Sequence, residues 1–365
     1  MGIKFFFTSV FAIILISPLV SAQSDLGAIP GWSKTLSGSV VEAHVYNGFV
    51  YAVSADGGVY EFNASSGVLL WSKSLGESAA AVEVYRGFIY VVTSNATLYV
   101  MSSDGTVQGK LRLGAHPAFP EGFIVSDTGF FVGGTDGRLF AYSLDGRFMW
   151  EYGAGGSVMA LSPSKDGGVI VAGDRQIYYL TSSGSLVRNF NLESYLRSVR
   201  LTPNLIVAYT GADRLVALNM SGDQIFNLNL ADEVGYIYAL NDSLLAGTRG
   251  GKIMHVLLNG TVLSSINLNS SVVAITSNDQ YAMASTLNDR LYLYGRNNTL
   301  LWTTPTTGRI LTFDNEDGHI IAGSSGGTLY RFNLPQKGTE ELKIAAAVIA
   351  VLFVVASILL IKSWR

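Results

Sequence analysis

The sequence contains no cysteine, and this absence removes several classes of protein at once. Without cysteine there is no disulfide bond, no thiolate metal site, no catalytic thiol and no lipid anchor attached through sulfur. An exported domain of this kind must rest on its apolar core alone. Hydrophobic residues make up 48% of the 365 residues, so a core of sufficient size can form.

Positive charge is also scarce. Of the 24 basic residues, Lys4, Lys362 and Arg365 lie in the terminal segments discussed below. The remainder is 24 − 3 = 21 basic against 27 acidic residues, a net charge of −6. A mildly acidic body with no basic cluster argues against nucleic acid as a partner.

Catalytic motifs are missing as well. The four histidines, His44, His116, His255 and His319, lie far apart, and neither a Gly-x-Ser-x-Gly turn nor a catalytic carboxylate pair stands out. Gly-rich steps at 133–137 and 247–252 join strand to strand with no helix N-terminus to receive a phosphate, so we interpret them as hairpin turns. The sequence therefore predicts no catalytic, cofactor-binding or metal-binding residue, leaving open a metal site assembled from distant strands.

The two ends of the chain carry the long apolar runs. Residues 1–22 have the pattern of a signal peptide, with Lys4 before an apolar run and small residues at the predicted cleavage site. Residues 344–361 are uncharged and apolar, which predicts a transmembrane helix; a buried core helix is the alternative. Residues 335–343 would then form a stalk and the basic residues 362–365 a cytoplasmic tail. The predicted localisation is the cell membrane, single-pass, with the ectodomain outside the cytoplasm.

A second interpretation of the stalk remains open. Residues 334–341 read LPQKGTEE and resemble a sortase sorting signal, but Lys337 stands where that signal has threonine. This departure favours a plain membrane stalk over processing by a sortase-like enzyme.

Internal repetition dominates residues 23–334. The apolar residue after each central turn recurs eight times with spacings of 39, 41, 38, 38, 38, 38 and 38, at Tyr60, Tyr99, Phe140, Tyr178, Val216, Met254, Tyr292 and Tyr330. A period near forty is typical of a four-stranded propeller blade. The sequence therefore predicts an all-β fold, an eight-bladed β-propeller.

The first unit shows the four expected strands: 40–46, 49–55, 58–64 and 69–75, separated by turns with Asn-Gly, Asp-Gly and Ser-Ser-Gly. The eighth unit has only three strands before Pro335. Its missing fourth strand matches the phrase at Trp32 to Leu36, which precedes the first unit. We therefore predict that an N-terminal outer strand closes the ring.

The repeat carries a family resemblance. VYEFNASSGVLLW (59–71), with weaker matches at 138–150 and 290–302, resembles the repeat of the pyrroloquinoline-quinone-like (PQQ-like) propellers over about residues 31–334. Four units lack the repeat's tryptophan and have Lys110, Arg188, Phe226 and Ser264 near its place.

Enzymes of this family are alcohol or sugar dehydrogenases that hold the quinone over a calcium ion. That calcium is bound by carboxylate and amide side chains, often near a disulfide. Other members are non-catalytic and act in envelope protein assembly. Because no calcium-binding set can be assigned here, the resemblance implies a membrane-anchored member that is not an enzyme and has no cofactor.

Asn-x-Ser/Thr sequons are more frequent than chance, which would give roughly three. We predict N-glycosylation at seven positions: Asn63, Asn95, Asn219, Asn241, Asn259, Asn269 and Asn297. Five of these, all except Asn95 and Asn269, fall on turns between the first and second or the third and fourth strands of a unit.

Those turns define one face of the propeller, which we call the lower face; the other connections define the upper face. The chain leaves the last unit on the lower face, so this face should look toward the membrane. The connection 114–122 lies on the upper face, and we predict that a partner binds there around His116, Phe119 and Glu121.

The predicted function is a cell-surface interaction scaffold that binds an envelope protein or a glycan. A quinone-dependent oxidoreductase and a structural envelope or coat component are the alternatives.

Overall fold

The computed structural model describes residues 30–334 apart from 117–121, 165, 193, 202–204, 241, 279, 296–297 and 317–318. The signal peptide, stalk, transmembrane helix and tail predicted from the sequence lie outside these residues. Within the described part of the chain, no helix is long and apolar enough to cross a membrane.

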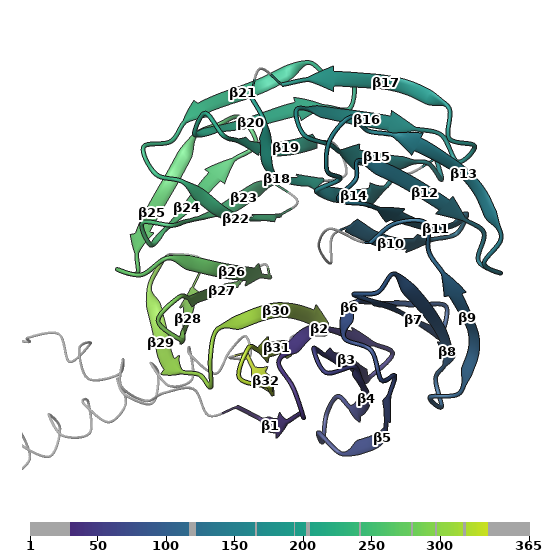
Figure 1. Cartoon of the computed structure of the whole chain (residues 1–365). Coiled ribbons are helices and arrows are strands. Elements are labelled where there is room, and N and C mark those ends of the chain that lie inside the picture. The colour runs from purple at the N-terminus through teal and green to yellow at the C-terminus, as the bar shows by residue number, and fades with distance from the viewer. Residues whose placement is uncertain are drawn as a thin grey trace, which may run out of the picture.

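Eight antiparallel sheets of four strands each are arranged in a ring around a central opening (Figure 1). We number the blades 1 to 8 in chain order, beginning with β2–β5. The innermost strands are β2 (Val40–Tyr46), β6 (Ala79–Tyr85), β10 (Phe123–Ser126), β14 (Ala160–Pro163), β18 (Leu196–Leu201), β22 (Val234–Ala239), β26 (Val272–Ser277) and β30 (Ile310–Glu316).

The second strands outward are β3 (Phe49–Ser54), β7 (Phe88–Thr93), β11 (Gly129–Gly133), β15 (Val169–Ala172), β19 (Leu205–Thr210), β23 (Ser243–Thr248), β27 (Tyr281–Thr286) and β31 (His319–Ser324). The third strands are β4 (Gly58–Asn63), β8 (Thr97–Ser102), β12 (Arg138–Tyr142), β16 (Gln176–Leu180), β20 (Arg214–Asn219), β24 (Lys252–Leu257), β28 (Arg290–Gly295) and β32 (Thr328–Asn333). The outermost strands are β5 (Leu69–Ser74), β9 (Val107–Arg112), β13 (Phe148–Gly153), β17 (Leu186–Asn191), β21 (Gln224–Asn229), β25 (Val262–Asn267), β29 (Leu300–Pro305) and β1 (Trp32–Thr35).

Local sequence explains the hairpins. Asn47 and Gly48 both have positive φ, 51° and 80°, as the two-residue turn between β2 and β3 requires. Arg86 and Gly87 repeat this geometry in blade 2 with φ of 50° and 80°. The predicted eight-bladed all-β architecture is therefore confirmed, with strand boundaries that agree to within one residue in the first blade.

The core lies between neighbouring blades rather than inside one of them. Residues of the second strands are almost completely buried and pack against the following blade; Tyr90 and Val92 of blade 2, for example, share a cluster with Phe123 and Phe130 of blade 3. Each blade therefore needs both neighbours to bury its apolar surface.

The eighth blade takes its outermost strand from the N-terminal end of the chain. Strand β1 pairs antiparallel with β32, with Trp32 opposite Arg331 and Thr35 opposite Thr328. Trp32 and Leu36 are buried in a cluster with residues of blades 8 and 1, including Leu329. The two ends of the described chain thus share one sheet.

A tryptophan on the outermost strand ties each of three blades to the next. The Nε1–H groups of Trp32, Trp71 and Trp150 donate to the carbonyl oxygens of Ala64, Ser103 and Ser182 at 2.9, 2.8 and 2.8 Å, in each case 32 residues later. A glycine in each of these turns lies under the indole; a Cβ on Gly67 would stand 2.7 Å from Trp32.

Blade 4 makes the same connection without tryptophan, because Arg188 Nη1 donates to the Met220 carbonyl oxygen at 3.0 Å. Phe226 and Ser264 occupy the tryptophan position in blades 5 and 6. In blade 2 the register places Gly109 there rather than Lys110, which lies one residue further along β9.

Candidate functional site in the central channel

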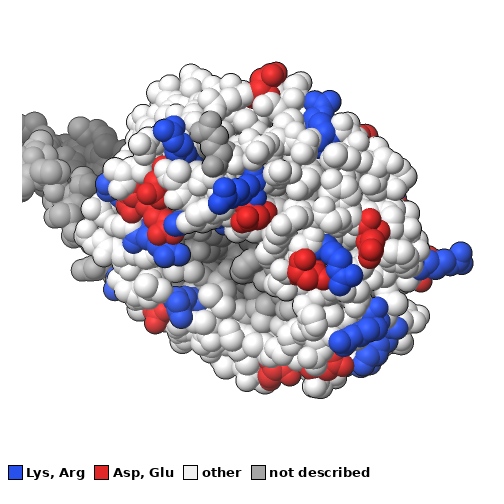
Figure 2. Space-filling view, turned by 45° about the horizontal axis from the view of Figure 1, so that its top comes forward, with Lys and Arg blue, Asp and Glu red and all other residues white. Residues whose placement is uncertain are grey.

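The inner strands surround a channel with a cavity volume of about 380 Å³. Side chains from seven of the eight blades line it. Figure 2 shows the surface hollowed at the centre of the ring, with acidic and basic side chains scattered around the hollow in small mixed groups. The channel is therefore the concave feature in which chemistry-bearing side chains from distant parts of the chain meet.

One position of the inner strand recurs in every blade. This position lies 16 residues before each of the eight repeating residues from Tyr60 to Tyr330, as in 60 − 44 = 16 and 330 − 314 = 16. The pairing registers place it opposite equivalent residues of the second strand. In chain order this position is occupied by His44, Glu83, Ile124, Ser162, Arg200, Tyr238, Thr276 and Asp314.

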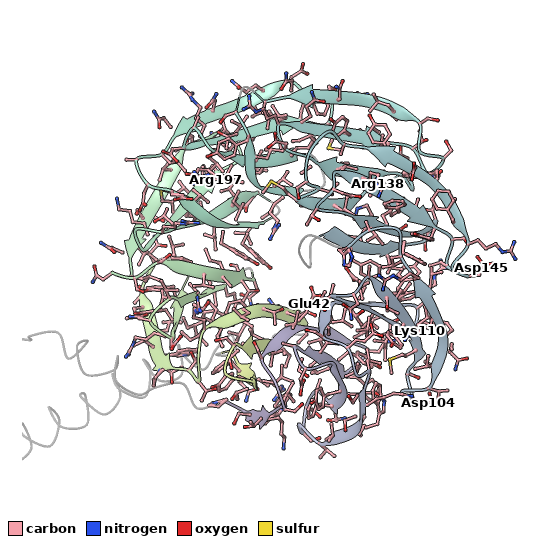
Figure 3. All side chains as sticks on the ribbon, viewed as in Figure 1. Glu42, Asp104, Lys110, Arg138, Asp145 and Arg197 are labelled. Carbon is pink, nitrogen blue, oxygen red and sulfur yellow. The ribbon has the colours of Figure 1, made fainter. Side chains whose placement is uncertain are left out.

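Three of these residues come together with Glu42 where blades 8, 1 and 2 meet. His44 Nε2 lies 3.5 Å from Glu42 Oε1, and His44 Nδ1 lies 3.6 Å from Asp314 Oδ2. The third carboxyl group is that of Glu83, on β6. We call these four residues the channel cluster; Figure 3 shows Glu42 beside the central opening, whereas Asp104 and Asp145 lie at the outer edge of the ring.

Backbone groups hold two of the carboxylates in place. Asp314 Oδ2 accepts the Val45 N–H at 2.6 Å, and Asp314 Oδ1 accepts the Asn315 N–H at 2.8 Å. Glu42 Oε2 accepts the Val82 N–H at 2.8 Å. The carboxylates therefore connect β30 to β2 and β2 to β6, which are the inner strands of three consecutive blades.

Charge and burial set the protonation of the cluster. Burial lowers the pKa of His44, but the adjacent carboxylates of Asp314 and Glu42 outweigh burial and raise the pKa well above its usual value. Burial raises the pKa of Asp314, but the adjacent His44 imidazolium outweighs burial and lowers it. His44 is thus an imidazolium held between two carboxylates at neutral pH.

Glu83 behaves in the opposite way. Burial, with help from the negative charges of Glu42 and Asp314, raises its pKa to about 7 although His44 acts against the shift. A carboxyl group that titrates near neutrality changes the charge of the channel wall by one unit over a physiological pH range.

The channel wall opposite blade 1 carries a positively charged side chain. Arg200 lies on β18 of blade 5, across the ring from blade 1, and its guanidinium lies 5.5 Å from the centroid of the Tyr236 ring. The Arg200 Nη1–H group donates to the Val199 carbonyl oxygen at 3.1 Å. The channel therefore has an acidic cluster toward blades 8, 1 and 2 and an arginine on the side of blade 5.

The channel cluster does not fit the calcium ion that the enzymes of the PQQ-like family use. Both Asp314 oxygens and one Glu42 oxygen already accept backbone N–H groups, and the His44 imidazolium lies between the two side chains. In the described part of the chain, no group of three or more His, Asp or Glu residues is placed to hold a metal ion.

Sequence reasoning missed this cluster because it treated His44 as an isolated histidine. That interpretation was wrong. Glu42 is only two residues away on the same strand, and Glu83 and Asp314 occupy the equivalent position in the adjoining blades. Comparing equivalent positions of the repeat would have found it.

Of the residues predicted to bind a partner, the structure describes one. His116 is exposed, and its Nδ1 lies 2.9 Å from the Ser94 carbonyl oxygen, which joins the connection after β9 to the turn after β7. Both segments belong to the upper face. Phe119 and Glu121 lie outside the described residues.

The predicted glycosylation sites fall on both faces. Asn63 and Asn219 are the last residues of third strands and Asn259 lies in the turn after one, all on the lower face, while Asn95 and Asn269 lie on the upper face. Asn219 Nδ2 donates to Asp223 Oδ2 at 2.8 Å, a bond that a glycan on this nitrogen would replace. Asn241 and Asn297 lie outside the described residues.

Comparison with known proteins supports the fold. Residues 23–194 match the family model described as outer membrane protein assembly factor BamB. No curated protein matches the chain in sequence.

Solved structures of similar shape include the following three. The designed protein Ika8 has 15% identity and a TM-score of 0.74, covering 82% of this chain and 98% of its own. BamB from Moraxella catarrhalis has 14% identity and a TM-score of 0.73, covering 84% and 100%. Sqt1 from Saccharomyces cerevisiae has 14% identity and a TM-score of 0.74, covering 85% and 99%.

Eight four-stranded blades around a polar channel define the class of protein, a β-propeller. The family match over residues 23–194 confirms the resemblance to the PQQ-like propellers that was drawn from the repeat.

Proposed function

We propose that this protein is a non-catalytic interaction scaffold of the cell envelope that binds a protein partner on its upper face. The observation that carries the proposal is the sequence match of residues 23–194 to the family described as an outer membrane protein assembly factor. The likeness to BamB and Sqt1 is consistent with it but concerns the fold.

The placement in the envelope rests on the ends of the chain. Residues 1–22 direct export, and residues 344–361 anchor the propeller in the membrane. The last described residue, Leu334, follows β32 at the lower face, and the ten residues 334–343 extend at most about 36 Å. The lower face therefore looks toward the membrane and the upper face away from it.

The partner site lies on the upper face around the connection 114–122. His116 fixes the start of this connection against the turn after β7, which gives the site a rigid side. Phe119 supplies an aromatic side chain, which contributes affinity, and Glu121 supplies a charge, which orients the partner.

Closure of the ring belongs to the same proposal. Pairing of β1 with β32 removes the open edge that a three-stranded eighth blade would present to other chains. The channel cluster reinforces the same part of the ring because it joins the inner strands of blades 8, 1 and 2. A closed, rigid ring presents its loops at fixed relative positions, which favours binding.

The experiment is quantitative capture of partners by the full-length chain, followed by mass spectrometry. A double variant, Phe119→Ala with Glu121→Ala, should lose at least nine tenths of the captured partner at unchanged melting temperature. Asn259→Ala on the lower face is the matched control and should retain it. Capture that survives the double variant but is lost on labelling the lower-face turns shows that the assignment of faces is wrong.

A further inference from the structure

The outermost strand of every blade has one edge with no neighbouring strand. Such an edge pairs with other chains unless a charged side chain or a proline prevents it. Six of the eight outermost strands contain a charged residue or a proline: Lys34 in β1, Lys73 in β5, Lys110 in β9, Glu151 in β13, Arg188 in β17 and Pro305 in β29. Strands β21 and β25, with the sequences QIFNLN and VLSSIN, contain neither.

The backbone of β21 presents hydrogen-bonding groups to the outside. The Leu230 N–H donates to the Asp213 carbonyl oxygen at 2.9 Å, just beyond the strand. Hydrogen-bonded and non-hydrogen-bonded residue pairs alternate along an antiparallel ladder. The backbone groups of Leu228 and Phe226 therefore form hydrogen bonds with β20. The N–H and C=O groups of Asn227 and Asn229 therefore point away from the sheet.

A groove runs beside the edge of β21, whereas the pocket that Ile266 of β25 helps to line is much smaller, about 30 Å³. The groove has a volume of about 650 Å³, and it lies between blade 4 and the outer part of blade 5. Its lining includes Phe190 and Asn191 of β17, Arg214 and Val216 of β20, and Gln224 and Asn227 of β21. An added strand would place every second side chain in the groove.

The groove also indicates the chemistry of the added strand. Arg214 Nη1 donates to Asn227 Oδ1 at 2.9 Å, and no carboxylate of the described residues lies within ion-pair distance of the guanidinium. A carboxylate oxygen from outside would therefore bind well here. A second copy of the chain, pairing through β21, would offer only the uncharged side chains of that strand.

We propose that the outer edge of blade 5 binds one extended segment of a partner protein by strand addition to β21. The segment is about six residues long, as β21 is, and its alternate side chains enter the groove with an Asp or Glu facing Arg214. The inference rests on the proposed scaffold function, but it concerns a different surface from the upper face.

The test uses a phage-displayed library of random twelve-residue peptides, selected against the full-length chain. Asn227→Pro removes an outward N–H at a position where an edge strand tolerates proline, while Asn227→Ala keeps that N–H. The best peptide should bind Asn227→Pro at least tenfold more weakly and Asn227→Ala within about threefold. Ser265→Pro, the equivalent change in β25, should leave affinity unchanged.

The remaining outcomes overturn the proposal. Three results would exclude blade 5 as the site. They are a peptide affinity that Asn227→Pro does not change, a selection that yields no binding peptide, and a loss of affinity with Ser265→Pro equal to that with Asn227→Pro. Self-association that Asn227→Pro abolishes, seen by sedimentation, would make a second copy the occupant. If partner capture through the upper face persists in any of these cases, the scaffold function stands and only the edge proposal fails.

Discussion

Replacing Glu83 by glutamine should make the protein more stable at alkaline pH and change its stability little at acid pH. Glutamine has the shape of a protonated glutamic acid but carries no charge at any pH. In the folded protein the pKa of Glu83 is raised from 4.5 to about 7, chiefly by burial. Ionisation of this side chain is therefore easier in the unfolded chain than in the channel.

The sign and the size follow from these two values. Between pH 4.5 and 7 the folded state binds more protons at Glu83 than the unfolded state, so the stability from this group is lost as pH rises through 7. The difference of 7 − 4.5 = 2.5 units corresponds to about 3 kcal/mol. Glu83→Gln should restore up to that amount at pH 8.5 and almost none of it at pH 4.5.

Urea unfolding followed by tryptophan fluorescence at both pH values measures the effect. Glu77→Gln is the matched control, because hydrogen bonds from Thr93 and Lys110 lower the pKa of Glu77 to about 2. Its stability contribution is present above pH 4.5 and lost at lower pH, so this variant should be less stable than the wild type at pH 8.5. Equal effects of Glu83→Gln at both pH values would refute the proposed environment of Glu83.

Three further predictions test the ring, the blade connections and the absence of a cofactor. Deleting residues 23–37 removes β1 and exposes the edge of β32, so the protein should aggregate; a truncated chain that stays monomeric in sedimentation with an unchanged melting temperature would rule out closure by β1. Trp150→Phe loses the bond to Ser182 and should lower the unfolding free energy by about 1 kcal/mol in urea titration, whereas an unchanged value would show that this bond contributes nothing. The purified chain should bind neither pyrroloquinoline quinone nor calcium and oxidise no alcohol or sugar; copurifying quinone absorbance, or a calcium-dependent rise in melting temperature of several degrees, would overturn this.

The repeat made most of the fold predictable. A spacing near forty residues with strand-forming runs and Asn-Gly turns is sufficient to infer four-stranded blades, and the missing strand of the eighth unit pointed to Trp32. These features are local or periodic, so they can be read from one sequence. The connection made by Arg188 was not predicted, because a guanidinium replaces an indole as the hydrogen-bond donor there.

The channel cluster shows the limit of reading the chain residue by residue. His44 and Asp314 are 270 residues apart and meet only because the ring closes. The period contains this information, since the two residues occupy the same position in adjacent blades. Their pKa shifts could not be predicted, because they depend on how deeply the channel buries each carboxyl group.

The uncharged edges of blades 5 and 6 are a similar case. The sequences of β21 and β25 contain no charged residue. They indicate an unprotected edge only when these strands are known to be the outermost ones of their blades. The groove beside β21 depends on the distance between two blades, which no local pattern encodes.

The scaffold function is tested most directly by site-specific photo-cross-linking in intact cells that express the full-length chain. A photoreactive residue replaces His116 on the upper face or, in a parallel variant, Asn259 on the lower face. We predict that one protein cross-links in high yield from position 116 and not from position 259. Equal labelling from both positions, or a cross-link from position 259 alone, would contradict a partner site on the upper face.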